Sequence, residues 1–355
     1  MNYIGSKLSL LQFLDESITK VVNNNCETFC DLFAGTGIVG AYFKKKGFTI
    51  IANDIQYYSY VLNRHYIGNS KELNFTHLTK EISGLKNITP KDRKNFVCHY
   101  LSGLKGKKGF IFNNYCLGGT KNGRLVRQYF SDNNGFKSDA IRQKIEDWKG
   151  ERLISQDEYF FLIASLIESI DKIANTASVY GAFLKKLKKT AQKSLVLQPA
   201  ELITNDKKNQ IFNEDVNELN KKIQTDILYL DPPYNHRQYA TNYHLLETIA
   251  KYDNPKIYGK TGLREYQNQK SLYCSKTKVK EVFQDLITKA KAKYIFLSYN
   301  NEGLLSLEEI KKIMGTRGEY GFFTKKYNRF KADRKENRDF KADKTTEYLH
   351  YVICE

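Results

Sequence analysis

The spacing of apolar residues divides this chain into outer parts with one pattern and a middle part with another. Apolar positions over 8–22 recur at helical spacing, which predicts an amphipathic helix there. Residues 28–33 have the pattern of a buried strand, 41–46 that of a helix and 49–52 that of a second strand. Together they predict one β-α-β unit with glycines at its first turn and an acidic residue, Asp54, after its second strand.

The middle segment, residues 66–197, is rich in lysine and lacks this β-α alternation. It contains a glycine-rich stretch at 103–123 and a pattern that predicts a helix at 156–174. The alternation then resumes, with a helix expected at about 243–252 and strands expected at 211–215, in the run that leads into Asp231, and at 293–299, 321–330 and 348–354. We expect an α/β fold in which 1–65 and 198–355 form one domain and 66–197 is an inserted, largely helical domain.

A charged hairpin is expected between the last two strands. It contains a short repeat, FKAD at 330–333 and again at 340–343, whose period is too short for a solenoid. A solvated loop is the simpler interpretation. The alternative is a basic arm that contacts phosphates, because five Lys or Arg residues lie between Lys331 and Lys341.

Composition adds a strong charge to this picture. The 355 residues include 57 Lys or Arg against 39 Asp or Glu, a net charge of +18, and also 25 Tyr and 21 Phe. A basic surface with many rings favours a nucleic-acid partner, although an AT-rich genome also enriches lysine and tyrosine. The six cysteines form no CxxC pair and have no histidines at zinc spacing, so we expect no metal. No signal-peptide or membrane-span pattern is present, which predicts a cytoplasmic protein. We expect a monomer or a weak dimer.

The glycines after the first predicted strand, Gly35, Gly37 and Gly40, spell GxGxxG. This pattern is typical of a dinucleotide-binding turn, and Asp54 stands near the distance at which an acidic residue binds ribose hydroxyls. The glycines let a backbone approach a ligand without naming it, so a nicotinamide enzyme remains an alternative to one that uses S-adenosylmethionine.

The tetrapeptide Asp231-Pro232-Pro233-Tyr234 directly follows the apolar run 227–230. Two prolines remove two backbone donors and fix two φ angles, so the chain leaves the sheet in a rigid direction. Asp231 and the carbonyl of Pro232 can accept hydrogen bonds from an exocyclic amino group, and Tyr234 offers a ring face for a base. The structural alternative is a proline cap with an aspartate that only ends a strand.

Five motifs occur in a fixed order: NYIGSK at 2–7, DLFAGTG at 31–37, ND at 53–54, DPPY at 231–234 and SYNNE at 298–302. In this order they resemble the Dam-like class of S-adenosylmethionine-dependent DNA adenine-N6 methyltransferases. The resemblance implies a mostly parallel, Rossmann-like methyltransferase sheet with a C-terminal antiparallel strand. It implies a catalytic and cofactor-binding domain at 1–65 and 198–355, and a target recognition domain at 66–197.

The resemblance also implies roles for individual residues. The expected catalytic residues are Asp231, Pro232, Pro233 and Tyr234, and the expected S-adenosylmethionine-binding residues are Tyr3, Lys7, Phe33, Gly35, Gly37, Asp54 and Asp215. Asp215 is followed by Val216, where the family more often has Phe. The expected DNA-binding residues are Arg124, Arg127, Lys185, Lys186, Lys188, Lys189, His236 and Arg237, although the lysines also suit an ordinary basic surface.

The sequence therefore predicts a site-specific DNA methyltransferase that acts on adenine N6 in double-stranded DNA after base flipping. The expected context is a prokaryotic restriction-modification system, with a cognate restriction endonuclease as a further partner. Cytosine-N4 methylation needs the same amine chemistry, but that class more often begins the motif with Ser, so Asp231 favours adenine. A DNA-binding module without turnover is the alternative from another class.

Overall fold

The computed structural model describes residues 3–328 and 344–355 and divides the chain into two compact units. The sheet unit comprises residues 4–63, 207–238 and 268–355, and the helical unit comprises residues 1–3, 64–206 and 239–267. The FKAD repeat at 330–333 and 340–343 and Asn2 of the first motif lie outside the described residues.

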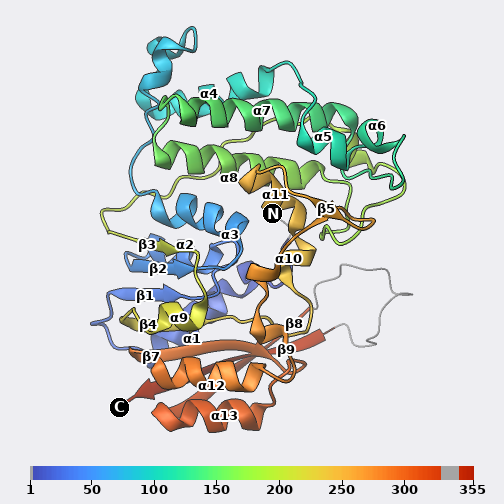
Figure 1. Cartoon of the computed structure of the whole chain (residues 1–355). Helices are drawn as coiled ribbons and strands as arrows, with labels where there is room; N and C mark the ends of the chain where they lie inside the picture. Colours follow the sequence, from blue (N-terminus) through green and yellow to red (C-terminus); the bar gives the residue numbers. More distant parts are fainter. Residues whose placement is uncertain (1–2, 329–343) are drawn as a thin grey trace. The chain divides into compact units, whose positions relative to one another are not determined.

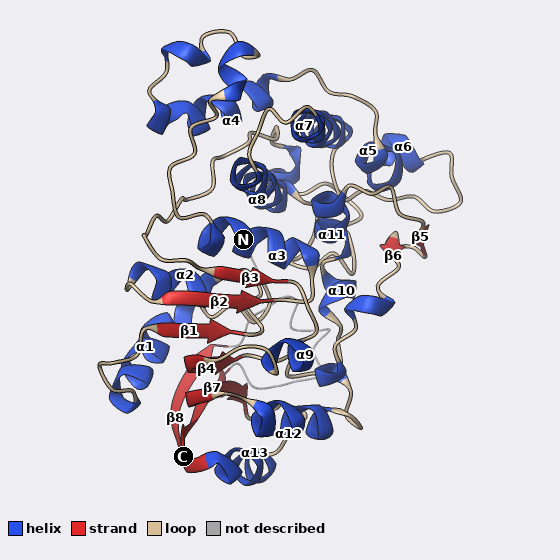
Figure 2. Ribbon diagram, turned by 60° about the vertical axis from the view of Figure 1, so that its left-hand side comes forward, coloured by secondary structure: helices blue, strands red, loops and turns tan. Residues whose placement is uncertain are grey.

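The sheet unit is built on seven strands among its described residues, in the order β3-β2-β1-β4-β7-β9-β8 (Figures 1 and 2). The pairs from β3 to β7 are parallel, whereas β9 runs antiparallel to both β7 and β8. The strands are β1 (Thr28–Asp31), β2 (Thr49–Asn53), β3 (Gln210–Phe212), β4 (Thr225–Leu230), β7 (Ala292–Asn300), β8 (Gly318–Asn328) and β9 (Lys344–Cys354). This arrangement confirms the predicted Rossmann-like sheet with an antiparallel C-terminal strand.

Helices cover both faces of this sheet, because the side chains of a buried strand alternate between two apolar surroundings. On one face, Phe29 of β1 stacks on Phe43 at a centroid distance of 4.1 Å. On the other, Leu228 and Leu230 of β4 join a core with Phe283. The helices are α1 (Leu11–Val21), α2 (Ile38–Lys45), α3 (Tyr57–Asn63), α9 (Val216–Asn220), α12 (Val279–Lys289) and α13 (Leu307–Met314), with 3₁₀ turns at Leu8–Leu10, Leu272–Cys274 and Gly315–Arg317.

The helical unit is organised around α8, most of whose residues are buried. A capping box between Ser155 and Glu158 starts this helix, and α7 lies beside it (Figure 2). The helices are α4 (Arg93–Gly103), α5 (Phe110–Tyr115), α6 (Leu117–Thr120), α7 (Asp132–Gly150), α8 (Gln156–Ile173), α10 (Tyr239–Asn242) and α11 (His244–Lys251). The two short strands are β5 (Ile257–Tyr258) and β6 (Leu263–Arg264); the single-turn helices are Arg64–Gly68, His77–Lys80, Leu85–Asn87, Pro90–Asp92 and Lys189–Gln192.

The helical unit differs in extent from the expected insert at 66–197, because it also takes in residues 239–267. The reason is a set of long-range hydrogen bonds from buried arginines. Arg142 of α7 is fully buried, and its guanidinium donates to the carbonyls of Ile249 at 2.8 Å and Ala250 at 3.0 Å, at the end of α11. The predicted helix at 243–252 is thus present, but it packs with the helices that precede it in the chain.

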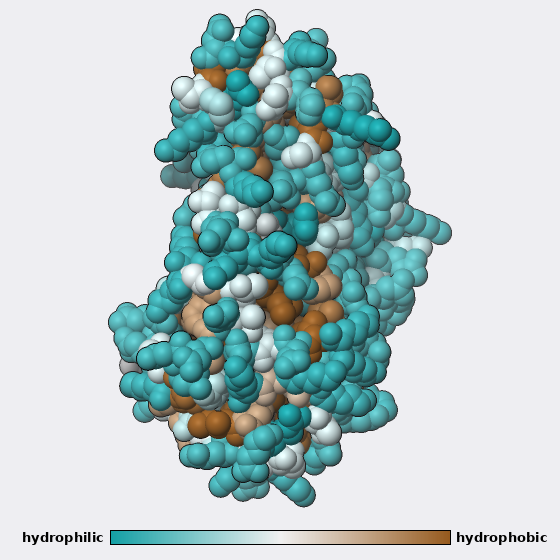
Figure 3. Space-filling view, turned by 90° about the vertical axis from the view of Figure 1, so that its left-hand side faces the viewer, coloured by the Kyte–Doolittle hydropathy of each residue, from teal (hydrophilic) through white to brown (hydrophobic). Residues whose placement is uncertain are grey.

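Hydrophilic side chains cover most of the face drawn in Figure 3, as the composition leads one to expect. None of the helices in the described part of the chain combines the length and apolarity that a bilayer crossing requires.

Candidate active site

The carboxyl ends of the parallel strands bring the predicted motifs of the sheet unit to one edge of the sheet. Chain order reverses between β1 and β4, since β2 and β3 lie on one side of this pair and β7 on the other. Such a switch point is where open α/β sheets bind their ligands. The glycine turn follows β1 and the DPPY tetrapeptide follows β4, so the two motifs flank the switch point.

The glycine turn is fixed by hydrogen bonds to its backbone. Gly35 and Gly37 have φ angles of 53° and 78°, a left-handed conformation that favours glycine. The carboxylate of Asp54 accepts from the N–H groups of Gly35 and Gln56, each at 2.8 Å. The side-chain amide of Asn63 donates to the carbonyl of Gly35 at 3.0 Å. The turn is therefore held open at the end of β1, with an acidic group beside it.

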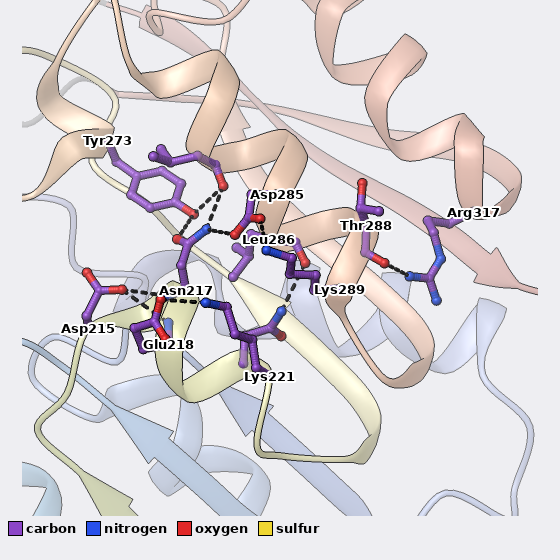
Figure 4. Close-up of polar contacts among 12 residues, drawn as sticks. Asp215, Asn217, Glu218, Lys221, Tyr273, Asp285, Leu286, Thr288, Lys289 and Arg317 are labelled. Carbon is purple, nitrogen blue, oxygen red and sulfur yellow. Dashed lines mark hydrogen bonds and ion pairs between the residues drawn. The ribbon is translucent and has the colours of Figure 1, made fainter.

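Asp215 follows β3 and begins α9. Its Oδ1 accepts from the N–H groups of Asn217 at 2.9 Å and Glu218 at 3.2 Å, and Figure 4 shows it beside the first turn of α9. No hydrogen bond to its Oδ2 occurs within the described residues, so that oxygen remains an acceptor. Phe33, half-buried, packs edge-on against Tyr273 at a centroid distance of 4.9 Å.

Asp231 and Tyr234 belong to a buried cluster with Lys7 and Glu347. The Lys7 ammonium lies 2.9 Å from Oδ1 of Asp231 and 3.2 Å from Oε1 of Glu347, and it donates to the Tyr234 hydroxyl at 2.8 Å. That hydroxyl lies 2.8 Å from Asp231 Oδ1 and 2.7 Å from Glu347 Oε1. The Asp231 side chain is 17% exposed, whereas that of Glu347 is 0% exposed. We call these four residues the carboxylate cluster.

Charge and burial act against each other in the carboxylate cluster. Burial alone would lower the pKa of Lys7, but the carboxylates of Asp231 and Glu347 outweigh it and raise that pKa well above its ordinary value. Burial raises the pKa of Asp231, and the Lys7 ammonium opposes this increase. Burial and the same two carboxylates raise the pKa of Tyr234 well above normal. Its hydroxyl therefore stays protonated and can donate.

Tyr3 and Lys7, which the resemblance assigns to the cofactor, belong to different units. Tyr3 belongs to the helical unit, where it stacks on Tyr243 at 4.6 Å and contacts Tyr239 at 5.6 Å between ring centroids. Lys7 is in the sheet unit, but its ammonium binds Asp231 and its neighbours in the carboxylate cluster.

The predicted DNA-binding residues fall into exposed and buried groups. His236 and Arg237 are exposed directly after the DPPY tetrapeptide. In the helical unit, Arg124 is exposed and lines a surface cavity. Lys188 is half-buried and donates to the carbonyl of Thr176 at 2.8 Å. The remaining lysines, Lys185, Lys186 and Lys189, are exposed.

Arg127, another predicted DNA contact, lines the same surface cavity as Arg124 but is largely buried. It is only 7% exposed, and its guanidinium donates to the carbonyls of Lys260 at 3.0 Å, Asn114 at 3.2 Å and Gly259 at 2.8 Å. A guanidinium that donates to three carbonyls holds backbone segments together.

Two acidic residues of the site had no role in the sequence prediction. Asp31 at the end of β1 is 1% exposed, and burial together with the charge of Asp231 raises its pKa well above normal. Glu347 lies just before the expected strand at 348–354. The one feature of the sequence that could have indicated its role is an acidic residue at the start of an apolar strand. Within the described residues, no cluster of three His, Cys, Asp or Glu side chains could hold a metal ion.

A doubly wound sheet with a glycine turn after β1 and a rigid acidic-aromatic loop at the switch point defines a class of enzymes that bind a nucleoside cofactor. The chain belongs to the D12 class of N6 adenine-specific DNA methyltransferases, whose family model matches residues 3–313. It is therefore an enzyme that methylates adenine N6 in DNA with a methyl donor. This membership confirms the predicted Dam-like class and decides against cytosine N4 and against a module without turnover.

Comparison with curated proteins agrees with this family. The chain is 50% identical to Type II methyltransferase M.NlaIII of Neisseria lactamica over 99% of both sequences. It is 36% identical to Type II methyltransferase M.CviAII of Paramecium bursaria Chlorella virus 1, again over nearly the full length of both. Type II methyltransferase M.FokI of Planomicrobium okeanokoites is 41% identical over 99% of this chain, which spans 52% of that longer protein.

Proposed function

We propose that this chain transfers the methyl group of S-adenosylmethionine to N6 of an adenine that has been flipped out of duplex DNA and held at the DPPY loop. The observation that carries this proposal is the asymmetry of Asp231. Its Oδ1 is occupied by Lys7 and Tyr234, while no hydrogen bond to its Oδ2 occurs within the described residues. The second oxygen is thus available to accept from an amine.

The chemistry of the target explains why this acceptor matters. The lone pair of an aromatic amine is delocalised into the ring, and two acceptors out of the ring plane favour a pyramidal, more nucleophilic nitrogen. Asp231 and the carbonyl of Pro232 supply these acceptors at a rigid loop. The carboxylate also stabilises the positive charge that develops on nitrogen, an electrostatic effect worth about 3 kcal/mol in comparable sites.

The residues around the glycine turn fit an S-adenosyl cofactor, which supplies an electrophilic methyl group when bound. Asp54 is an acceptor for ribose hydroxyls, and Oδ2 of Asp215 is one for an exocyclic amino group. Gly35 and Gly37 allow close approach to the backbone, and the half-buried Phe33 offers an apolar contact.

Duplex binding and base extrusion complete the proposal. Extrusion of a base costs roughly a few kcal/mol of free energy. Contacts of the protein to the DNA backbone and to the flipped base offset this cost. His236 and Arg237 are exposed next to the DPPY loop and are suited to phosphates near the displaced base. In the helical unit, we assign target recognition to 66–197 and phosphate or base contacts to the exposed residues Arg124, Lys185, Lys186 and Lys189.

We also propose that the enzyme is the modification component of a restriction-modification system, with a cognate endonuclease that cleaves the same sequence. The support is that relatives matching nearly its whole length are named Type II methyltransferases. The recognition sequence would be read by sequencing DNA from a methylation-free host that expresses this chain.

The test of the proposed function combines binding and product analysis. We expect S-adenosylhomocysteine, and not NAD, to raise the melting temperature. Labelled S-adenosylmethionine and duplex DNA should yield labelled N6-methyladenine, and more quickly when the target adenine is mismatched and easier to extrude. The variant Asp231→Ala should bind the cofactor without turnover. Stabilisation by NAD alone, or near-normal turnover by Asp231→Ala, would contradict the proposal.

A further inference from the structure

Glu347 is a carboxylate whose position the methyl-transfer chemistry described above does not use. It lies on β9, paired in register with Asn300 of β7, and its side chain is 0% exposed. Removing a carboxylate from water is costly unless hydrogen bonds and an opposite charge compensate. Lys7 and Tyr234 of the carboxylate cluster are among its compensating partners.

The charges of the carboxylate cluster are unequal, since one ammonium serves two carboxylates. Lys7 can neutralise either Asp231 or Glu347, which leaves one net negative charge within these four residues when both carboxylates are ionised. An apolar or amide side chain on β9 would avoid this cost, so the acidic residue has a stability penalty that calls for another explanation.

The hydrogen-bond geometry supplies that explanation. The Lys7 ammonium has three protons, and its three neighbours are Asp231 Oδ1, the Tyr234 hydroxyl and Glu347 Oε1. The Tyr234 hydroxyl has one proton and lies within hydrogen-bond distance of both carboxylates. Without Glu347, both donors would be free to turn toward Asp231, where they could also occupy Oδ2.

We infer that Glu347 is a positioning residue for methyl transfer: it holds the Lys7 ammonium and the Tyr234 hydroxyl on one side of Asp231, so that Oδ2 remains open to the target amine. The inference rests on the proposed function, because it needs Asp231 to accept from that amine. Glu347 acts through its neighbours and does not touch the base.

The electrostatic surroundings of Asp231 make the effect measurable as a pH dependence. The groups that face Asp231 are Lys7 before α1, Tyr234 of its own loop, Tyr229 of β4, Asp31 of β1 and Glu347 of β9. The negative charge of Glu347 raises the pKa of Asp231. Its removal lets Asp231 ionise at lower pH, so the acid limb of the rate profile should move to lower pH.

The experiment measures single-turnover methylation by the full chain at saturating S-adenosylmethionine and duplex DNA, with both dissociation constants and thermal unfolding measured in parallel. We expect Glu347→Gln to lower the rate about a hundredfold, as a misplaced reacting group does, and to leave both dissociation constants within about threefold. The acid limb of its pH-rate profile should lie at lower pH than that of the wild type. Glu319→Gln on neighbouring β8, a carboxylate outside the carboxylate cluster, is the matched control and should match the wild type.

A second variant separates positioning from simple loss of structure. Glu347→Asp keeps the charge but shortens the side chain, so its acid limb should coincide with that of the wild type and its rate should exceed that of Glu347→Gln. A Glu347→Gln rate within about twofold of wild type, an unmoved acid limb, or no advantage of Glu347→Asp would overturn the inference. If Glu347→Gln does not fold, the rate of Glu347→Asp relative to wild type decides, and a rate within about twofold of wild type would overturn the inference. Absence of N6-methyladenine with the wild type would instead defeat the proposed function.

Discussion

Lys7 connects three segments that are far apart in the chain. Its bond to the Tyr234 hydroxyl joins residues 227 positions apart, and it also binds Asp231 and Glu347. The Lys7 side chain is 4% exposed and that of Glu347 is 0% exposed, so these two charges are nearly removed from water. A buried ion pair adds little net stability, but removal of one partner leaves an uncompensated charge.

This geometry predicts how Lys7→Met changes stability with pH. Loss of the ammonium leaves Asp231 and Glu347 close together, so we expect about 3 kcal/mol less free energy of unfolding at about pH 8. Without Lys7, the paired carboxylates of the folded state bind a proton at about pH 5, whereas those of the unfolded state do not. The free energy of unfolding of the variant therefore falls as the pH rises from about 5 to about 8. The loss should therefore be smaller at about pH 5 than at about pH 8.

Urea denaturation at both pH values measures this difference. Lys280→Met is the matched control, because Lys280 pairs with Glu309 at the surface with its own side chain 59% exposed. Such pairs contribute about 0–1 kcal/mol. Equal losses for Lys7→Met at both pH values would show that the two carboxylates do not repel each other in the folded protein.

The sequence was sufficient to predict which residues lie at the edge of the sheet, but not how they contact one another. Asp231, Tyr234 and Asp54 follow strands, and residues at the carboxyl ends of parallel strands must meet. Glu347 reaches the same place through antiparallel pairing of β9, and its register depends on contacts 113 positions apart. Local patterns carry no information about such a register.

At the scale of elements, local patterns predict a helix or strand from its own residues, whereas the elements it packs against depend on residues far away in the chain. The helix expected at 156–174 is α8 (Gln156–Ile173), because its apolar run and capping residues lie within one segment. The helix expected at 243–252 is α11, but its place in the helical unit depends on Arg142, which lies more than a hundred positions earlier. The physical cause is a buried guanidinium that needs carbonyl acceptors.

Arg127 holds elements together in the same way, which predicts a contrast with Arg124. Arg127→Met leaves the carbonyls of Asn114, Gly259 and Lys260 without this donor, and each unsatisfied buried carbonyl costs about 1–3 kcal/mol. We expect a loss of about 3 kcal/mol in the free energy of unfolding, since water can satisfy part of the set. Arg124→Met, at an exposed position, should change stability by less than about 0.5 kcal/mol.

Arg124→Met and Arg127→Met should also differ in their affinity for DNA. Arg124→Met should weaken the affinity for duplex DNA while the fold is unchanged, as expected for a side chain that contacts the partner. Urea denaturation and fluorescence anisotropy with a labelled duplex measure both properties. Equal stability of the two variants would show that the hydrogen bonds of Arg127 contribute nothing to the helical unit.

At the scale of the whole molecule, the net charge of +18 creates a positive electrostatic field that attracts the DNA substrate. Basic residues outnumber acidic ones in the sheet unit and in the helical unit, so the excess is not confined to one of them. Charge of this kind supplies affinity for any duplex, whereas base contacts supply the choice of sequence.

A long-range positive field predicts a steep salt dependence of DNA binding. Each phosphate neutralised by Lys or Arg releases condensed counterions, so the logarithm of the association constant falls linearly with the logarithm of salt concentration. With six or more phosphate contacts, affinity for a duplex without the target site should fall about a thousandfold or more between about 50 mM and 200 mM salt. If Asp54 and Asp215 bind the cofactor as proposed, its affinity should change little over the same range, because such contacts act at short distance. Anisotropy titrations at several salt concentrations give the slope, and Arg124→Met should reduce it by about one if that residue binds a phosphate. A slope near zero would mean that the excess charge faces away from DNA, and base contacts would then have to supply the affinity.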